Sequence, residues 1–232
     1  MRIVGVPVAG GPAVIDRLVG HAEDPVALLR ADGYAIRRLL SVTGLAPDLV
    51  VTAQVSRRHE WTARLARRRR TRSPQSASGE IPRRQRVAAY AIGLSDSGLL
   101  ATQFSDRTAA AGLWGLPGGG LLTGESAAQA VVREIEEETS QRVRLIRVLD
   151  IQSDHWVGQS PTGQWEDFHA LRLIYLGRID HPTRPVVVDV GGTTAAAIWV
   201  PLGHWRQVGW SAGHRAILGR HLDRLIRTAV ET

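Results

Sequence analysis

The pattern of apolar and polar residues divides the chain into two structured regions separated by a basic segment. Three runs rich in Val, Ile and Leu predict strands in the first region: Arg2 to Val8, Tyr34 to Val42 and Leu49 to Val55. Asp24 followed by Pro25 predicts a helix that continues to Ala31, because proline is favoured at the first helical position. Residues 1–56 are therefore interpreted as a small α/β unit, with packing or dimer formation as its expected role.

The pattern is more regular after residue 86. Six runs predict strands: Val87 to Leu94, Leu99 to Phe104, Val143 to Ile151, Phe168 to Leu176, Pro185 to Val190 and Ala195 to Val200. A helix over about Ala127 to Thr139 is predicted from Ser126 as N-cap and from apolar residues at helical spacing. A second helix is expected from about Gly213 to Ala229. Strands interspersed with helices in this order predict an α/β fold.

The net charge of +7 comes from one short segment. All 29 basic residues are arginine, which suggests a GC-rich coding sequence and weakens a functional reading of any single arginine. Residues 57–86 hold 11 Arg and two Glu, a net +9, so the remaining residues carry a net −2. Residues 57–85 are interpreted as an Arg-rich linker, helical in its first part. The segment 57–86 is either simply solvated or makes weak contact with nucleic acid or acidic lipid.

Composition excludes some classes of protein. The chain has no cysteine, so disulfides and thiol chemistry are excluded. The apolar run from Ile3 to Ile15 is interrupted by glycine and proline and is too short to cross a membrane. We expect a cytoplasmic protein with no membrane partner.

Candidate chemistry is concentrated in the helix predicted over Ala127 to Thr139. Glu134, Glu137 and Glu138 are spaced i, i+3 and i+4 and therefore share one helical face, whereas Glu136 points away. Carboxylates on one stripe repel one another, and a hard divalent cation such as Mg²⁺ relieves that repulsion. The alternative is a solvated acidic face. Three glycines upstream, Gly118 to Gly120, allow the backbone to approach a ligand closely, which favours a site for a metal–diphosphate complex.

This stretch resembles the Nudix hydrolase family, whose box reads G-x5-E-x7-R-E-U-x-E-E-x-G-U, with U bulky and apolar. Gly119 is followed by five residues and Glu125, and seven more lead to Arg133-Glu134-Ile135-Glu136-Glu137-Glu138. The match departs at its last two places, where Ser140 replaces glycine and Gln141 replaces the apolar residue. The resemblance implies a Nudix-type α/β/α sandwich with a mixed sheet over residues 86–232.

The resemblance also implies an activity, the metal-dependent hydrolysis of a nucleoside diphosphate linked to another moiety. It implies Mg²⁺ (or Mn²⁺) bound by the side chains of Glu134, Glu137 and Glu138 and by the carbonyl of Gly118. Arg133 is expected to hold the box carboxylates by bidentate pairing. Glu137, Glu138 and Arg133 are thus the expected catalytic residues of the box.

Other site residues are expected outside the helix. The general base is either a box glutamate or an acid in the loop between Gly163 and the strand at Phe168, where Glu166 is the first choice; Asp167, Asp154 and His155 are the alternatives. Contacts to the substrate are expected from five residues: Gly118, Gly119, Gly120, Trp156 and Trp165. The two tryptophans either stack on a base or serve in packing, and His169 is expected to be structural.

Two other classes of function remain open at this point. A regulator could bind a nucleotide metabolite through the Nudix-type region and nucleic acid through residues 1–86, although such regulators often lose the box carboxylates that this chain keeps. An isomerase of the isopentenyl-diphosphate type relies on a cysteine, and none is present. The substrate alternatives are (d)NTPs, nucleotide-sugars, dinucleoside polyphosphates and capped RNA. A homodimer is also consistent with the sequence.

Overall fold

The computed structural model describes residues 1–58, 81–160, 163–189 and 191–230. Most of the predicted linker, with its expected helix, therefore lies outside the described residues. The chain forms two compact units. The first comprises Met1–Ala88, Leu121–Ala127 and Val148–Leu173, and the second comprises Ala89–Gly120, Ala128–Arg147 and Ile174–Thr232. Both units draw on distant parts of the sequence, so neither is a simple stretch of chain.

The first unit contains a four-stranded sheet in the order β2-β1-β4-β3. The bounds are Arg2–Val6 for β1, Ile15–Leu18 for β2, Tyr34–Thr43 for β3 and Val50–Arg57 for β4. Strand β1 pairs parallel with β4 and antiparallel with β2. Helix α1 (Pro25–Ala31) begins as predicted, with the Asp24 carboxylate accepting the Val26 amide at 2.8 Å. Strand β2 was not predicted, because it is short and three of its four residues are exposed.

The second sheet has seven strands, and its main path is β11-β6-β5-β10-β9. Its longer strands are β5 (Arg83–Ser95), β6 (Gly98–Phe104), β9 (Arg144–Gln159), β10 (Trp165–Arg178) and β11 (Thr194–Val200). Two short strands flank the glycine turn: β7 (Trp114–Gly115) pairs with β6, and β8 (Gly118–Gly120) pairs with β5. Strand β5 begins at Arg83, within the segment interpreted as linker.

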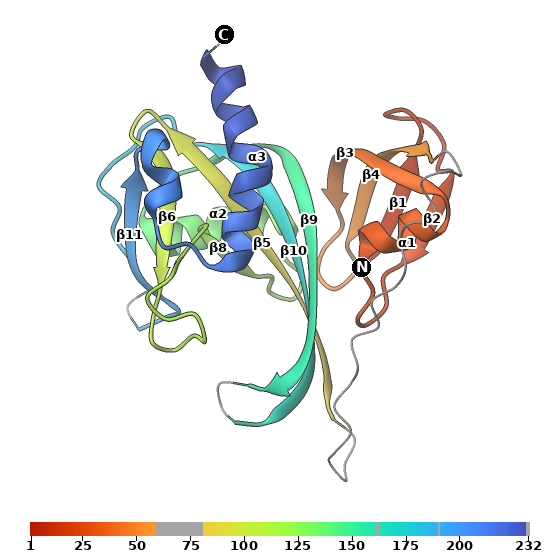
Figure 1. Ribbon diagram of the computed structural model, residues 1–232, viewed down its shortest axis with the longest axis horizontal. Coiled ribbons are helices and arrows are strands. Elements are labelled where there is room, and N and C mark those ends of the chain that lie inside the picture. The colour runs from red at the N-terminus through yellow and green to blue at the C-terminus, as the bar shows by residue number, and fades with distance from the viewer. Residues whose placement is uncertain (59–80, 161–162, 190, 231–232) are drawn as a thin grey trace. The chain divides into compact units, whose positions relative to one another are not determined.

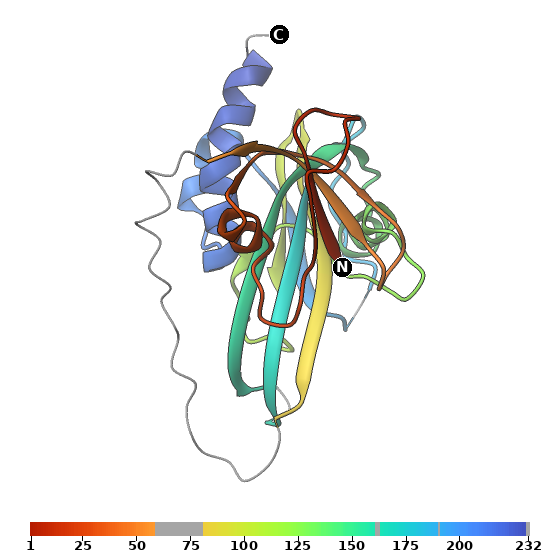
Figure 2. The ribbon, with the colours of Figure 1, turned by 90° about the vertical axis from the view of Figure 1, so that its right-hand side faces the viewer.

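Two α-helices accompany this sheet, and Figures 1 and 2 show them on opposite faces of it. Helix α2 (Ala127–Thr139) has the predicted bounds, and it buries Ala130, Val131 and Ile135 completely. Helix α3 (Ala212–Val230) follows a 3₁₀ helix, η2 (Leu202–Gln207), that was not predicted. The layers confirm the α/β fold class. None of the helices in the described part of the chain is both long and apolar enough to span a membrane.

Two expected elements are wrong in detail. Strands β9 and β10 extend into the region predicted as a loop, so Glu166 and Asp167 are strand residues. The expected strand from Pro185 to Val190 is not formed over the described residues 185–189. Instead, the Val186 amide donates to the Thr139 carbonyl at 3.1 Å and the Val188 amide donates to the Glu137 carbonyl at 2.9 Å. These amides satisfy carbonyls at the end of α2, which have no partner within the helix, and so pair with no neighbouring strand.

The two departures from the family box lie at this helix end and are both accommodated. Ser140 adopts a positive φ of 56°, the conformation for which glycine is usual, and its hydroxyl donates to the Val186 carbonyl at 2.9 Å. Gln141 is buried, and its amide group donates to Thr183 Oγ1 at 2.8 Å and accepts from the Thr183 amide at 3.0 Å. Side-chain hydrogen bonds thus replace the apolar contact that the box expects at this position.

Candidate active site

The glycine turn lies close to β5 at Gly118 and close to α2 at Gly119, which leaves little space for a side chain at either position. A Cβ atom on Gly118 would lie 2.3 Å from the Ala89 carbonyl oxygen, and Gly118 has a φ of 139°. A Cβ atom on Gly119 would lie 2.5 Å from Glu134 Oε1 and 2.6 Å from its Cδ. A side chain at 119 would therefore displace the carboxylate of Glu134, which occupies the space beside the turn.

Arg133 connects the first two carboxylates to the turn. Its Nη1 donates to Glu134 Oε1 and to Glu137 Oε2, each at 3.0 Å, and its Nη2 donates to the Gly120 carbonyl at 3.2 Å. One nitrogen of Arg133 thus bridges two of the box carboxylates. The side chain of Glu137 is 46% exposed and that of Glu134 is 18% exposed, so Glu137 is the more accessible of these two to a ligand.

The third carboxylate is held differently. Glu138 is 8% exposed; its Oε2 accepts the Gly118 amide at 2.9 Å and its Oε1 accepts the hydroxyl of Thr194. Burial raises the pKa of Glu138 to about 7 despite these two hydrogen bonds, and the negative charges of Glu134 and Glu137 also raise it. The helix therefore carries a buried carboxylate whose negative charge is poorly compensated by the protein alone.

These residues fit a divalent cation in their donor chemistry. All three glutamates offer carboxylate oxygens, which suit Mg²⁺ and Mn²⁺. The glycine at 119 leaves the Glu134 carboxylate room beside the backbone, and the charge of Glu138 lacks a cationic partner among its hydrogen bonds. The residues proposed to hold the cation are Glu134, Glu137, Glu138 and the Gly118 carbonyl.

A recess of ≈ 510 Å³ lies next to Thr194, the hydroxyl partner of Glu138. Its lining comes from the loop after β6, from the segment before β11 and from the start of β11: Ser105, Asp106, Arg107, Val187, Gly191, Gly192, Thr194 and Ala195. Volumes of this size are typical of small-ligand sites. Neither Arg107 nor Thr194 was expected from the sequence. The one nearby feature of the sequence that could have indicated this recess is the run Gly191-Gly192-Thr193-Thr194, which lies outside the box.

The remaining expected site residues belong to the first unit. Glu166 lies on β10, and its side chain is 13% exposed. Its Oε2 is 4.0 Å from Nη1 of Arg84. Trp156 on β9 and Trp165 at the start of β10 are 40% and 46% exposed, and the Trp156 ring lies 5.5 Å from that of Phe168. Asp154 is paired with Arg172. These residues thus lie on strands β9 and β10, whereas the box residues lie on or beside α2.

The family of the chain follows from a comparison with family models. Residues 84–218 match the model described as the NUDIX domain. This match covers more than half of the chain and contains the glycine turn, α2 and Thr194. The chain therefore belongs to the Nudix hydrolase family, as its box predicts.

Solved structures similar to this chain are also Nudix proteins. They include a MutT NUDIX hydrolase from Burkholderia pseudomallei, at 28% identity over 59% of this chain and 98% of that chain, with a TM-score of 0.45. The NUDIX domain of Shewanella oneidensis NrtR, complexed with ADP ribose, matches at 21% identity over 61% of this chain and 88% of that chain, with a TM-score of 0.47. No curated protein matches the chain. Membership of the family rests on the domain match alone.

Proposed function

We propose that this Nudix hydrolase cleaves a nucleoside diphosphate linked to another moiety, with Mg²⁺ or Mn²⁺ held by the box glutamates. The observation that supports the proposal is the arrangement of α2 beside the glycine turn. Glu134 and Glu137 share Nη1 of Arg133, and Glu138 is buried against the Gly118 amide. When bound, the cation would neutralise diphosphate charge and lower the pKa of a water molecule.

The protein's own groups would then position the reactants. Water attacks one phosphorus atom of the diphosphate. The bond from that phosphorus to the bridging oxygen breaks, and the bridging oxygen leaves with the other phosphate group as part of the second product. The backbone of Gly118, Gly119 and Gly120 lets the diphosphate approach without a clash with side chains. Arg133 holds two carboxylates in place, and a lysine could not make its three hydrogen bonds with the same planar geometry.

The proton of the attacking water requires an acceptor. We propose Glu137 for this role, because its side chain is 46% exposed. Glu166 belongs to the first unit and stays a prediction from the sequence. Stacking of Trp156 and Trp165 on a base also stays a prediction, because both residues belong to the first unit. The ≈ 510 Å³ recess beside Thr194 is a second place where part of a substrate could lie.

A substrate panel tests the proposal. The chain is incubated with (d)NTPs, nucleotide-sugars, dinucleoside polyphosphates, ADP-ribose and capped RNA, with Mg²⁺ or Mn²⁺, and the products are separated by chromatography. We expect cleavage of a diphosphate bond in at least one compound, abolished by excess EDTA. Undiminished turnover in EDTA would refute the metal-dependent mechanism, and an inert panel in both metals would refute the substrate class.

A further inference from the structure

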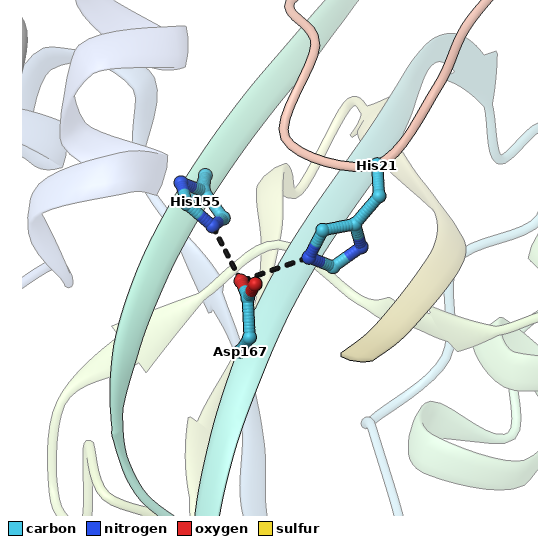
Figure 3. Close-up of side chains that lie close together, drawn as sticks. All are labelled: His21, His155 and Asp167. Atoms are coloured by element: carbon cyan, nitrogen blue, oxygen red, sulfur yellow. Dashed lines mark hydrogen bonds and ion pairs between the residues drawn. The ribbon is translucent and has the colours of Figure 1, made fainter. Parts of the chain in front are cut away.

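A second group of potential metal ligands lies within the first unit, formed by His21, His155 and Asp167 (Figure 3). His21 follows β2, His155 lies on β9 and Asp167 lies on β10. Nε2 of His21 is 2.8 Å from Asp167 Oδ1, and Nε2 of His155 is 2.6 Å from the same oxygen. The three ligand atoms all lie within 4.8 Å of one another. Two imidazoles and one carboxylate thus converge on one point.

The backbone immediately after His21 has a strained conformation that is held by a hydrogen bond to a buried histidine. Ala22 has a positive φ of 63°, which is unusual for a residue with a side chain. Its amide donates to Nδ1 of His169 at 3.1 Å, and His169 is completely buried. Nε2 of His169 in turn lies 2.8 Å from Ser153 Oγ. The buried histidine therefore fixes the loop one residue after His21.

Asp167 is also fixed, and it is available as an anion. Its amide donates to the Pro82 carbonyl at 3.0 Å, and its Oδ2 lies 3.8 Å from Nε of Arg83. Burial raises the pKa of Asp167, but the hydrogen bonds from His21 and His155 outweigh this effect, so the pKa is lowered. The carboxylate is therefore ionised at neutral pH, as a metal ligand must be.

We propose that His21, His155 and Asp167 bind a transition-metal ion of the Zn²⁺ class, at a site separate from the box glutamates. Two imidazole nitrogens and one carboxylate oxygen match the ligands that Zn²⁺ takes, and they differ from the all-oxygen set of the box. Three protein ligands leave the fourth position to water. Because the side chain of His155 is 31% exposed, that water can exchange with solvent.

Ion binding replaces the two hydrogen bonds by metal–ligand bonds. In a tetrahedral site with bonds of about 2.0–2.1 Å, neighbouring ligand atoms are about 3.3 Å apart. The observed 2.6 and 2.8 Å are hydrogen-bond separations, so the ligands must move apart by roughly half an ångström. Each histidine must also carry its proton on Nδ1, so that Nε2 presents a lone pair. Zn²⁺ would then connect the loop after β2 to the β9–β10 hairpin.

The decisive experiment is a Zn²⁺ titration of the full chain by calorimetry, in excess Mg²⁺ to occupy oxygen-only sites. We expect one Zn²⁺ per chain, with the affinity at least tenfold weaker in His21→Gln and in His155→Gln. His204→Gln is the matched control, because His204 is exposed on η2, and it should bind as the unmodified chain does. Equal affinity in all four proteins would overturn the proposal, and so would the absence of Zn²⁺ binding to the unmodified chain.

A spectroscopic measurement covers the case in which a variant does not fold. Co²⁺ bound by histidine nitrogens in a four-coordinate site absorbs visible light much more strongly than six-coordinate Co²⁺ with oxygen ligands. We expect the strong absorption for the unmodified chain in excess Mg²⁺, with one Co²⁺ per chain and with loss of the band on addition of Zn²⁺. A weak six-coordinate spectrum alone would overturn the proposal without recourse to any variant.

Discussion

Substituting Glu138 by glutamine should stabilise the metal-free protein above neutral pH. The folded chain raises the pKa of this carboxyl from 4.5 to about 7, mainly because Glu138 is buried. The folded state therefore binds the proton more tightly than the unfolded state does. The stability of the unmodified protein consequently falls as pH rises from about 4.5 to about 7, and the loss is complete above that window.

The magnitude follows from the two pKa values. One pKa unit corresponds to about 1.4 kcal/mol, so the difference between 4.5 and about 7 amounts to roughly 3 kcal/mol at most. Glutamine is uncharged, so its burial has no cost from an ionised group, and it can keep the hydrogen bonds to Gly118 and Thr194. Its Oε1 can accept the Gly118 amide, while its Nε2 donates to the hydroxyl of Thr194 after that hydroxyl turns. We expect a gain of about 1–3 kcal/mol at pH 8, or several degrees in melting temperature.

The assay is thermal unfolding in EDTA at pH 5 and pH 8, for the unmodified chain, for Glu138→Gln and for Glu136→Gln. Glu136 is the matched control because it lies exposed on the same helix. The advantage of Glu138→Gln should appear at pH 8, shrink at pH 5, and reverse when Mg²⁺ is added, because the variant has lost a ligand. A Glu138→Gln protein that is no more stable than the unmodified chain at pH 8 would refute this reasoning.

Three further predictions concern the same region. Glu137→Gln should lower kcat by roughly a hundredfold or more at saturating metal, since about 1.4 kcal/mol of lost charge stabilisation is tenfold in rate; Glu136→Gln measured in parallel should change little. Gly119→Ala should displace the Glu134 carboxylate and weaken Mg²⁺ binding at least tenfold by calorimetry, whereas Gly203→Ala, which has open space around it, should not. Gln141→Ala should cost about 1–3 kcal/mol in urea unfolding, because buried hydrogen-bond partners lose their bonds, and an unchanged midpoint would contradict the role given to this side chain.

The part of the fold predicted from sequence is the part encoded by local spacing. Helix α2 has the predicted bounds because the residues that predict it, from Ser126 through the apolar and acidic positions, are close together in the sequence. The segment from Pro185 looked like a strand because it is rich in valine, and only the position of the α2 carbonyls explains why its amides bond there. Strand β2 was missed because a short, exposed edge strand has little apolar pattern to reveal it.

For the candidate site too, the residues that are close together in the sequence could be predicted and those that are far apart could not. The box glutamates and the glycines beside them follow from a spacing that can be read along the chain. The pairing of Glu138 with Thr194 joins residues 56 positions apart, and that of His21 with Asp167 joins residues 146 apart. Such pairs arise from the way strands are arranged in the fold, and nothing in the neighbouring sequence marks them.

The bonds between the segment after β10 and the end of α2 limit how this part of the chain can vary in length. Val186 and Val188, two residues apart, reach the carbonyls of Thr139 and Glu137, which are also two residues apart. An insertion or deletion between these two valines would break that match and leave helix-end carbonyls without donors. Length changes should therefore be tolerated poorly between Val186 and Val188, even though this stretch has no regular secondary structure.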